Sequence, residues 1–132
     1  MKLKALDHVN IITDDLQASA AFYRDLLGLD IRPGPPPLKP EWVLWLYDDA
    51  GRAVVHLNHA DMPKTVERDL SGPKTGVLHH VAFECEGFEE MHSDLEMRQA
   101  AFHVSELPAI SLKQIFIEDP NGVLLELNFR EG

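Results

Sequence analysis

The sequence is poor in cysteine, in positive charge and in long apolar runs, and each shortage excludes a class of protein. A single cysteine, Cys85, rules out an intramolecular disulfide framework and fits the reducing cytoplasm. The 12 Lys and Arg residues are outnumbered by 22 Asp and Glu, and the net charge of −10 argues against nucleic acid or an anionic membrane as a partner. No run approaches the roughly 18 apolar residues that span a bilayer, and no signal-peptide segment follows Met1.

What the sequence does contain is an internal repeat. Residues 6–11, LDHVNI, return as residues 78–83, LHHVAF, and the closing segment HLN at 56–58 returns as ELN at 126–128. His80 follows His8 by 72 residues, and Glu126 follows His56 by 70. All four are metal-ligand side chains, and a pseudo-two-fold axis between two modules would bring them together. A metal site is therefore the leading hypothesis.

Each half of the sequence is predicted as a β-α-β-β-β module. In module one, residues 3–59, strands are expected at 6–12, 29–32, 42–47 and 53–58. A helix is expected to begin after Thr13 or Asp14 and to end at Gly28. Its apolar face consists of Leu16, Ala20, Tyr23 and Leu27. The proline-rich residues 33–40 are expected to form an extended surface loop that serves as a connector.

A polar linker, residues 60–76, is expected before module two, residues 77–130. Strands are predicted at 79–84, 102–107, 114–118 and 123–129, with a helix over 88–100. The helix carries an apolar stripe of Phe88, Met91, Leu95 and Met97. The prediction is a single α+β domain, residues 1–132, in which two paired βαβββ modules form curved sheets around a central metal pocket.

The repeat, the helix end at residues 22–29 and the segment DPNGVLLEL at 119–127 resemble the vicinal oxygen chelate superfamily. That superfamily includes glyoxalase I, methylmalonyl-CoA epimerase, fosfomycin-resistance transferases, extradiol dioxygenases and metal-free bleomycin-binding proteins. The resemblance implies a homodimer and metal ligands on the first and last strands of the modules. It implicates His8, His80 and Glu126, with His56 at the remaining position, where relatives carry Glu or Gln.

Three imidazoles and one carboxylate suit Zn, Fe, Ni, Co or Mn and disfavour Ca. In a six-coordinate shell, four protein ligands leave two adjacent positions for the vicinal oxygens of a small substrate. The ion would stabilise an enolate or enediolate as a Lewis acid. This pattern favours lyase or isomerase chemistry, and the resemblance permits Glu126 or His56 to leave the ion and act as the catalytic base.

Two alternatives stay open. His8, His80 and Glu126 alone match the facial triad of an Fe(II) ring-cleaving dioxygenase of an aromatic diol. That chemistry needs three open positions, so His56 at the ion would leave too few. The other alternative is a metal-free binding or bleomycin-resistance protein, which has no need of His and Glu at the matched positions.

The other candidates have stronger structural explanations. His79 is expected on the opposite strand face from His80, and Glu41, the remaining candidate base, is expected to be exposed. Trp42 and Trp45 have opposite strand parity, so only one can face the pocket. Three further histidines are expected outside the ligand set: His59, His92 and His103. Cys85 lies in a strand-like stretch and is expected to be a buried, unreactive thiol.

Overall fold

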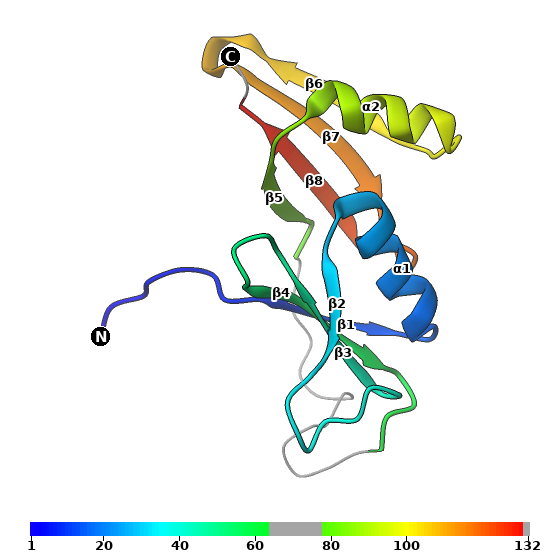
Figure 1. The fold of residues 1–132 in the computed structure, drawn as a ribbon. Coiled ribbons are helices and arrows are strands. Elements are labelled where there is room, and N and C mark those ends of the chain that lie inside the picture. The colour runs from blue at the N-terminus through cyan, green and yellow to red at the C-terminus, as the bar shows by residue number, and fades with distance from the viewer. Residues whose placement is uncertain (64–77, 131–132) are drawn as a thin grey trace. The chain divides into compact units, whose positions relative to one another are not determined.

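The computed structural model describes residues 1–63 and 78–130. The chain divides into two compact units, Met1–Lys74 (unit 1) and Thr75–Gly132 (unit 2), and each is described by itself. The division lies in the segment that the sequence predicts as a linker, of which residues 64–76 are outside the described residues. Each unit contains a β-α-β-β-β series (Figure 1), so the predicted α+β class and module order are confirmed.

Unit 1 is a four-stranded mixed sheet with one helix. Its elements are β1 (Val9–Thr13), α1 (Leu16–Leu27), β2 (Asp30–Pro33), β3 (Val43–Tyr47) and β4 (Ala53–His59). The strand order is β1-β4-β3-β2, in which β1 runs parallel to β4 and the other pairs are antiparallel. The first strand of the unit therefore lies next to its last strand.

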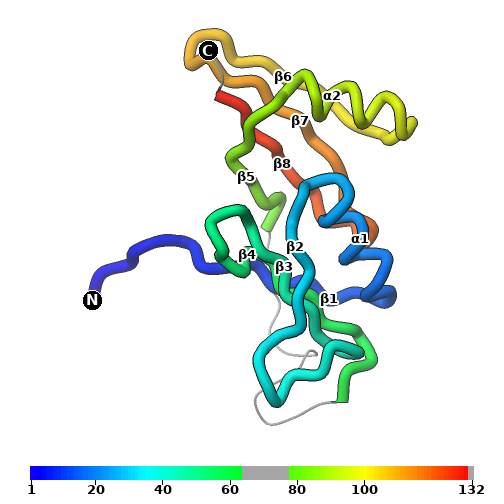
Figure 2. The backbone as a smooth tube through the Cα atoms, viewed as in Figure 1, coloured from blue at the N-terminus to red at the C-terminus, as the bar shows by residue number. Residues whose placement is uncertain are grey.

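Unit 2 repeats this topology. Its elements are β5 (Val81–Cys85), α2 (Phe88–Met97), β6 (His103–Leu107), a 3₁₀ turn (Pro108–Ile110), β7 (Leu112–Glu118) and β8 (Leu124–Phe129). The strand order is β5-β8-β7-β6, and β5 runs parallel to β8. Figure 2 follows the backbone through both series.

The two faces of each sheet differ in what covers them. In unit 1, α1 packs on β3 and β4, and its fully buried Tyr23 belongs to a core that includes Ile11, Leu46, Val55 and Leu57. Successive strand residues point to opposite faces, so the residues between these core positions lie on the face away from the helix. In each unit we call the sheet face away from the helix the open face. In unit 2, Leu95 of α2 is fully buried, and Phe88 meets Phe129 edge to face at 5.6 Å.

The helix ends show where local prediction was right and where it was wrong. Gly28 ends α1 with φ 71°, as predicted. The N-cap of α1 is Asp15, whose side chain accepts a hydrogen bond from the Ala18 N–H, and not Thr13 or Asp14. Thr13 is buried, and its hydroxyl is hydrogen-bonded to that of Ser19 at 2.8 Å. Asp15 is therefore the first polar side chain placed to meet the free amides of the helix.

Helix α2 ends at Met97, three residues before the predicted end. Gln99 adopts φ 55° and follows Gly28 by 71 residues, but Arg98 in the right-handed region separates it from Met97, whereas Gly28 directly follows Leu27. Met97 is 84% exposed, and the predicted apolar stripe was wrong at this residue. The left-handed residue ends the helix whatever apolar spacing continues beyond it.

The first strand of each unit begins later than predicted. Strand β1 starts at Val9 rather than residue 6, and β5 starts at Val81 rather than residue 79. His8 and His80 therefore lie directly before a strand instead of inside it. Among the described residues, no helix has the length and apolar character needed to cross a membrane.

Candidate metal centre

Strand register places the four predicted ligands at equivalent positions. Asn10 of β1 pairs with His56 of β4, and Ala82 of β5 pairs with Glu126 of β8. His8 and His80 each lie two residues before the paired β1 or β5 residue and directly before the strand. Each unit therefore supplies one histidine before its first strand and one ligand-type side chain on its last strand.

In unit 1, three rings are stacked on the open face. The imidazoles of His8 and His56 are 3.7 Å apart between centroids, with an interplanar angle of 13°. Trp45 stacks on His56 at 4.0 Å and 10°. Strand β4 lies between β1 and β3, so His56 lies between the other two rings. His56 is only 6% exposed, and this packing restricts its imidazole to one plane.

Trp45 is itself held by the proline-rich loop. A Cβ atom at Gly34 would come within 3.3 Å of Trp45 Nε1 and 2.9 Å of Leu38 Cδ1, so the loop has no room for a side chain there. Trp45 Nε1 is buried without a hydrogen-bond partner in the described structure. Trp42, by contrast, meets His59 edge to face at 5.6 Å. Trp45 is thus the tryptophan on the open face, and the proline-rich residues 33–40 pack against it.

His8 also contacts the residue before it. Its Nδ1 atom is 2.6 Å from Asp7 Oδ2. A carboxylate accepts hydrogen bonds, so this contact favours the tautomer that carries its proton on Nδ1 and leaves a lone pair on Nε2. Metal-binding histidines are commonly oriented in this way. Sequence reasoning did not select Asp7, although it directly precedes the repeated histidine.

In unit 2, His80 lies between two partners. Its Nε2 is 3.6 Å from Glu126 Oε1, and its Nδ1 is 3.0 Å from Nδ1 of His79. The prediction that His79 points away from His80 was wrong. Both residues precede β5, so the alternation of a strand does not apply to them. His79 follows Asp7 by 72 residues, and this repeat spacing is the signal that would have found both residues.

The carboxylate of Glu126 has a further partner on its own strand. Asn128 Nδ2 donates a hydrogen bond to Glu126 Oε2 at 2.9 Å, and Gln114 Nε2 donates to Asn128 Oδ1 at 3.0 Å. The side chain of Glu126 is 15% exposed. Sequence reasoning left open whether Gln114 lies at the pocket, and it missed Asn128, although Asn128 belongs to the repeated closing segment.

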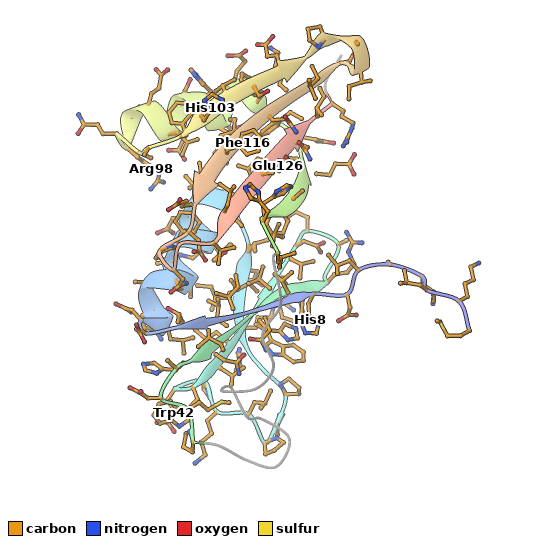
Figure 3. All side chains as sticks on the ribbon, turned by 180° about the vertical axis from the view of Figure 1, so that it is seen from behind. His8, Trp42, Arg98, His103, Phe116 and Glu126 are labelled. Atoms are coloured by element: carbon orange, nitrogen blue, oxygen red, sulfur yellow. The ribbon has the colours of Figure 1, made fainter. Side chains whose placement is uncertain are left out.

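The other histidines and Glu41 are not members of these pairs. Figure 3 shows Glu126, Phe116 and His103 on neighbouring strands of unit 2, and Phe116 is paired with both of the others. His92 contacts Glu96 on α2, and Glu41 is exposed as predicted. In the part of the chain that the structure describes, no three His, Cys, Asp or Glu side chains gather as a metal site. The ligand candidates are brought together as two pairs, His8 with His56 and His80 with Glu126.

Cys85 does not have the properties of a reactive thiol. Burial raises the pKa of its side chain from 9.0 to about 11, and the neighbouring Glu84 charge acts in the same direction. Its thiol lies 3.7 Å from the carbonyl oxygen of Phe83. At neutral pH Cys85 is therefore protonated and a weak nucleophile, as predicted, although it is half-buried rather than buried.

Comparison with known proteins gives a match over nearly the whole chain. The model of the Glyoxalase/Bleomycin resistance protein/Dioxygenase superfamily matches residues 5–127. Mitochondrial methylmalonyl-CoA epimerase of Mus musculus is 30% identical over 133 residues, which cover 96% of this chain and 73% of that protein. A protein of Arabidopsis thaliana named Glyoxylase I 4 is 27% identical over 131 residues, covering 96% and 71%.

Solved structures agree on the fold. Lactoylglutathione lyase from Agrobacterium tumefaciens superposes with a TM-score of 0.66 at 21% identity, over 98% of this chain and 96% of that one. An integron cassette protein from V. cholerae gives a TM-score of 0.73 at 16% identity, over 99% and 98%. The two repeated modules are therefore the fold of these proteins.

Proposed function

This chain belongs to the Glyoxalase/Bleomycin resistance protein/Dioxygenase superfamily, and from that premise we propose that it is a metal-dependent isomerase or lyase. Its substrate would be a small molecule with two neighbouring oxygens. The epimerase and lyase names of its relatives support this reaction class. The observation that carries the proposal is the equivalent register of the pairs His8–His56 and His80–Glu126.

The donor set fits a divalent transition-metal ion. We propose that His8, His56, His80 and Glu126 hold it, and three imidazoles with one carboxylate suit Zn, Fe, Ni, Co or Mn. Within each pair the groups lie close, at 3.7 Å between the rings of His8 and His56 and 3.6 Å between His80 and Glu126. When bound, the ion supplies Lewis-acid stabilisation of negative charge on the substrate oxygens.

The surrounding side chains prepare these groups for that role. Asp7 accepts a hydrogen bond from Nδ1 of His8 and leaves Nε2 free. Trp45 and His8 stack on the two sides of His56, and the His8 ring would have to turn out of this stack to share an ion with His56. Asn128 donates a hydrogen bond to Oε2 of Glu126, so we propose that Oε1, once released from the ion, takes a proton from the substrate carbon and returns it.

The first test is metal content, measured by elemental analysis of protein purified without chelator. We expect stoichiometric metal in the wild type and a sharp loss in His56→Ala. His92→Ala is the matched control, because His92 lies on α2 beside Glu96 and we expect it to leave the metal content unchanged. Exchange of the acidic substrate proton in D₂O would then report activity, with a fall of about 10²–10⁴-fold in Glu126→Gln.

The outcomes separate the three classes of function. Iron that is fully retained in His56→Ala, together with catechol-dependent oxygen uptake, would replace the proposal with ring-cleaving dioxygenase chemistry. Absence of metal after reconstitution would overturn both enzyme functions and leave a small-molecule binding protein. We also propose that the protein is cytoplasmic, which the single unbridged Cys85 supports. We further propose that it is a homodimer, which the superfamily resemblance supports.

A further inference from the structure

A chain of hydrogen bonds crosses the open face of unit 2. It runs from Gln114 on β7 to Asn128 on β8, and from Asn128 to Glu126, with bonds of 3.0 and 2.9 Å. Gln114 and Asn128 are directly paired in the register of the two strands. Asn128 is only 8% exposed, and hydrogen bonds shielded from water in this way hold their geometry more firmly than exposed ones.

The carboxylate fixes the direction of this chain. An ionised Glu126 only accepts hydrogen bonds, so Asn128 must turn its NH₂ group towards it. The amide oxygen of Asn128 then faces Gln114 and needs a donor, which only the NH₂ group of Gln114 supplies between these two side chains. Both amides are oriented because residue 126 is an acid.

Unit 1 carries no such chain at the equivalent positions. Val43 occupies the place of Gln114 and pairs with Asn58, the counterpart of Asn128. Asn58 is fully buried, its Nδ2 is 3.7 Å from Met62 Sδ, and its Oδ1 has no hydrogen-bond partner in the described structure. The last strand of unit 1 carries His56 instead of an acid. The complete chain of hydrogen bonds is therefore present in the unit whose last strand carries the carboxylate, and the shared topology alone does not produce it.

We infer that Asn128 and Gln114 are positioning residues that make Glu126 bind the cation through Oε1 alone. This inference rests on the proposed function. The final torsion of a glutamate side chain is soft, so an unrestrained carboxylate turns readily. Asn128 holds Oε2, and Oε1 is left on the side of His80 Nε2, at 3.6 Å. Partners of this kind commonly govern metal affinity without touching the metal.

The test is a titration of the metal-free full-length protein with Co²⁺, followed by absorption, and with Zn²⁺ against a chromophoric chelator. Asn128→Leu removes the donor, and we expect metal affinity to fall about 10–100-fold. We expect a loss in the same direction in Gln114→Glu, although Asn128 is intact, because an acceptor at position 114 turns the Asn128 carbonyl towards Glu126. The Co²⁺ spectrum should change in both variants.

Gln99→Glu is the matched control. It makes the same exchange and adds the same charge at an exposed position of unit 2, and we expect wild-type affinity. The melting temperature of the metal-free protein is an independent readout. The double variant Asn128→Leu with Gln114→Val should lower it by less than the sum of the two single variants, because Asn128→Leu alone already breaks the chain of hydrogen bonds.

The outcomes distinguish this inference from the function on which it rests. Wild-type affinity and an unchanged Co²⁺ spectrum in Gln114→Glu would overturn the inference and leave the metal-dependent function standing. Strictly additive melting losses would also overturn it. Failure of the wild-type protein to bind Co²⁺ or Zn²⁺ would overturn the proposed function and the inference together.

Discussion

At the scale of single residues, the candidate ligands could be predicted because they recur at matched positions of the repeat. Strand pairing places His56 and Glu126 at equivalent positions, and His8 and His80 each lie directly before the first strand of their unit. The partners of these residues could not be predicted by the same route. The contact of His79 with His80 depends on the exact start of β5, and the stacking of Trp45 on His56 depends on which of two tryptophans lies in register.

The contact between Asp7 and His8 gives the first prediction. We expect Asp7→Ala to weaken Zn²⁺ binding about 10-fold, because His8 loses the acceptor that fixes its tautomer. Asp7 is 92% exposed, which favours the lower end of the range for such partners. Competition with a chromophoric chelator measures the affinity. Asp14→Ala, an exposed acid at the start of α1, is the control, and an equal loss in both variants would mean a general charge effect.

The thiol of Cys85 gives the second prediction. Because burial raises its pKa from 9.0 to about 11, we expect slow reaction with Ellman's reagent at pH 7.5, full reaction in urea, and a labelling rate that climbs towards pH 11. The folded state holds this proton more tightly than the unfolded state. The contribution to stability is therefore complete below about pH 9 and is lost as pH rises to about 11. Rapid labelling of the folded protein at pH 7.5 would contradict the prediction.

At the scale of elements, strands and helices could be predicted because apolar periodicity and turn residues agree, whereas their ends could not. Both Asp48 and Asp119 accept backbone hydrogen bonds from residues two and four places on, which closes the turn before the last strand of each unit. The predicted end of α2 was wrong because Gln99 adopts a left-handed conformation. Gly and Asn are the residue types that predict this conformation after a helix, and Gln is not.

The paired helix ends give the third prediction. Gln99→Gly should raise the free energy of unfolding by about 1 kcal/mol, since a glycine adopts φ 55° without strain. Gly28→Gln should lower it by about the same amount, because φ is 71° while no atom lies within 4 Å of the added Cβ. Urea unfolding of both variants measures the changes. If both variants unfolded at the urea midpoint of the wild type, neither position would be strained.

At the scale of the whole molecule, the repeat predicts two copies of one topology, and the chain divides between Lys74 and Thr75, inside the expected linker. The repeat cannot predict differences between the copies. The open faces of the two units share a backbone plan, yet one carries three stacked rings and the other a chain of amides ending at an acid. These differences arise from single positions such as Val43 and Gln114.

The fourth prediction concerns ligands from both units. Zn²⁺ at about 100 times its dissociation constant should stabilise the folded protein by about 2.7 kcal/mol. We expect this gain to be much reduced in His8→Ala of unit 1 and equally in Glu126→Gln of unit 2, if all four side chains hold one ion. Thermal melting with and without Zn²⁺ measures it. A gain that survives one substitution intact would remove that residue from the ligand set.

The fifth prediction concerns assembly. We expect light scattering after size exclusion to give twice the chain mass of 14.9 kDa, as a homodimer requires. Dilution together with addition of a chelator provides the control for assembly through metal. A mass of one chain at micromolar concentration would contradict the prediction.

The register of β3 and β4 has a consequence for the ancestry of the two halves. Leu46 pairs with Val55 and Tyr47 with Ala53, so Val54 is an extra residue bulged out of the ladder, whereas Ile117 and Glu118 pair with Leu125 and Leu124 in unbroken order. The spacing between the copies falls from 71 to 70 residues at this point. An alignment of the halves must therefore open its gap opposite Val54. Placed anywhere after His56, the gap would match this histidine with Leu127, and the inherited correspondence between an imidazole and a carboxylate would be missed.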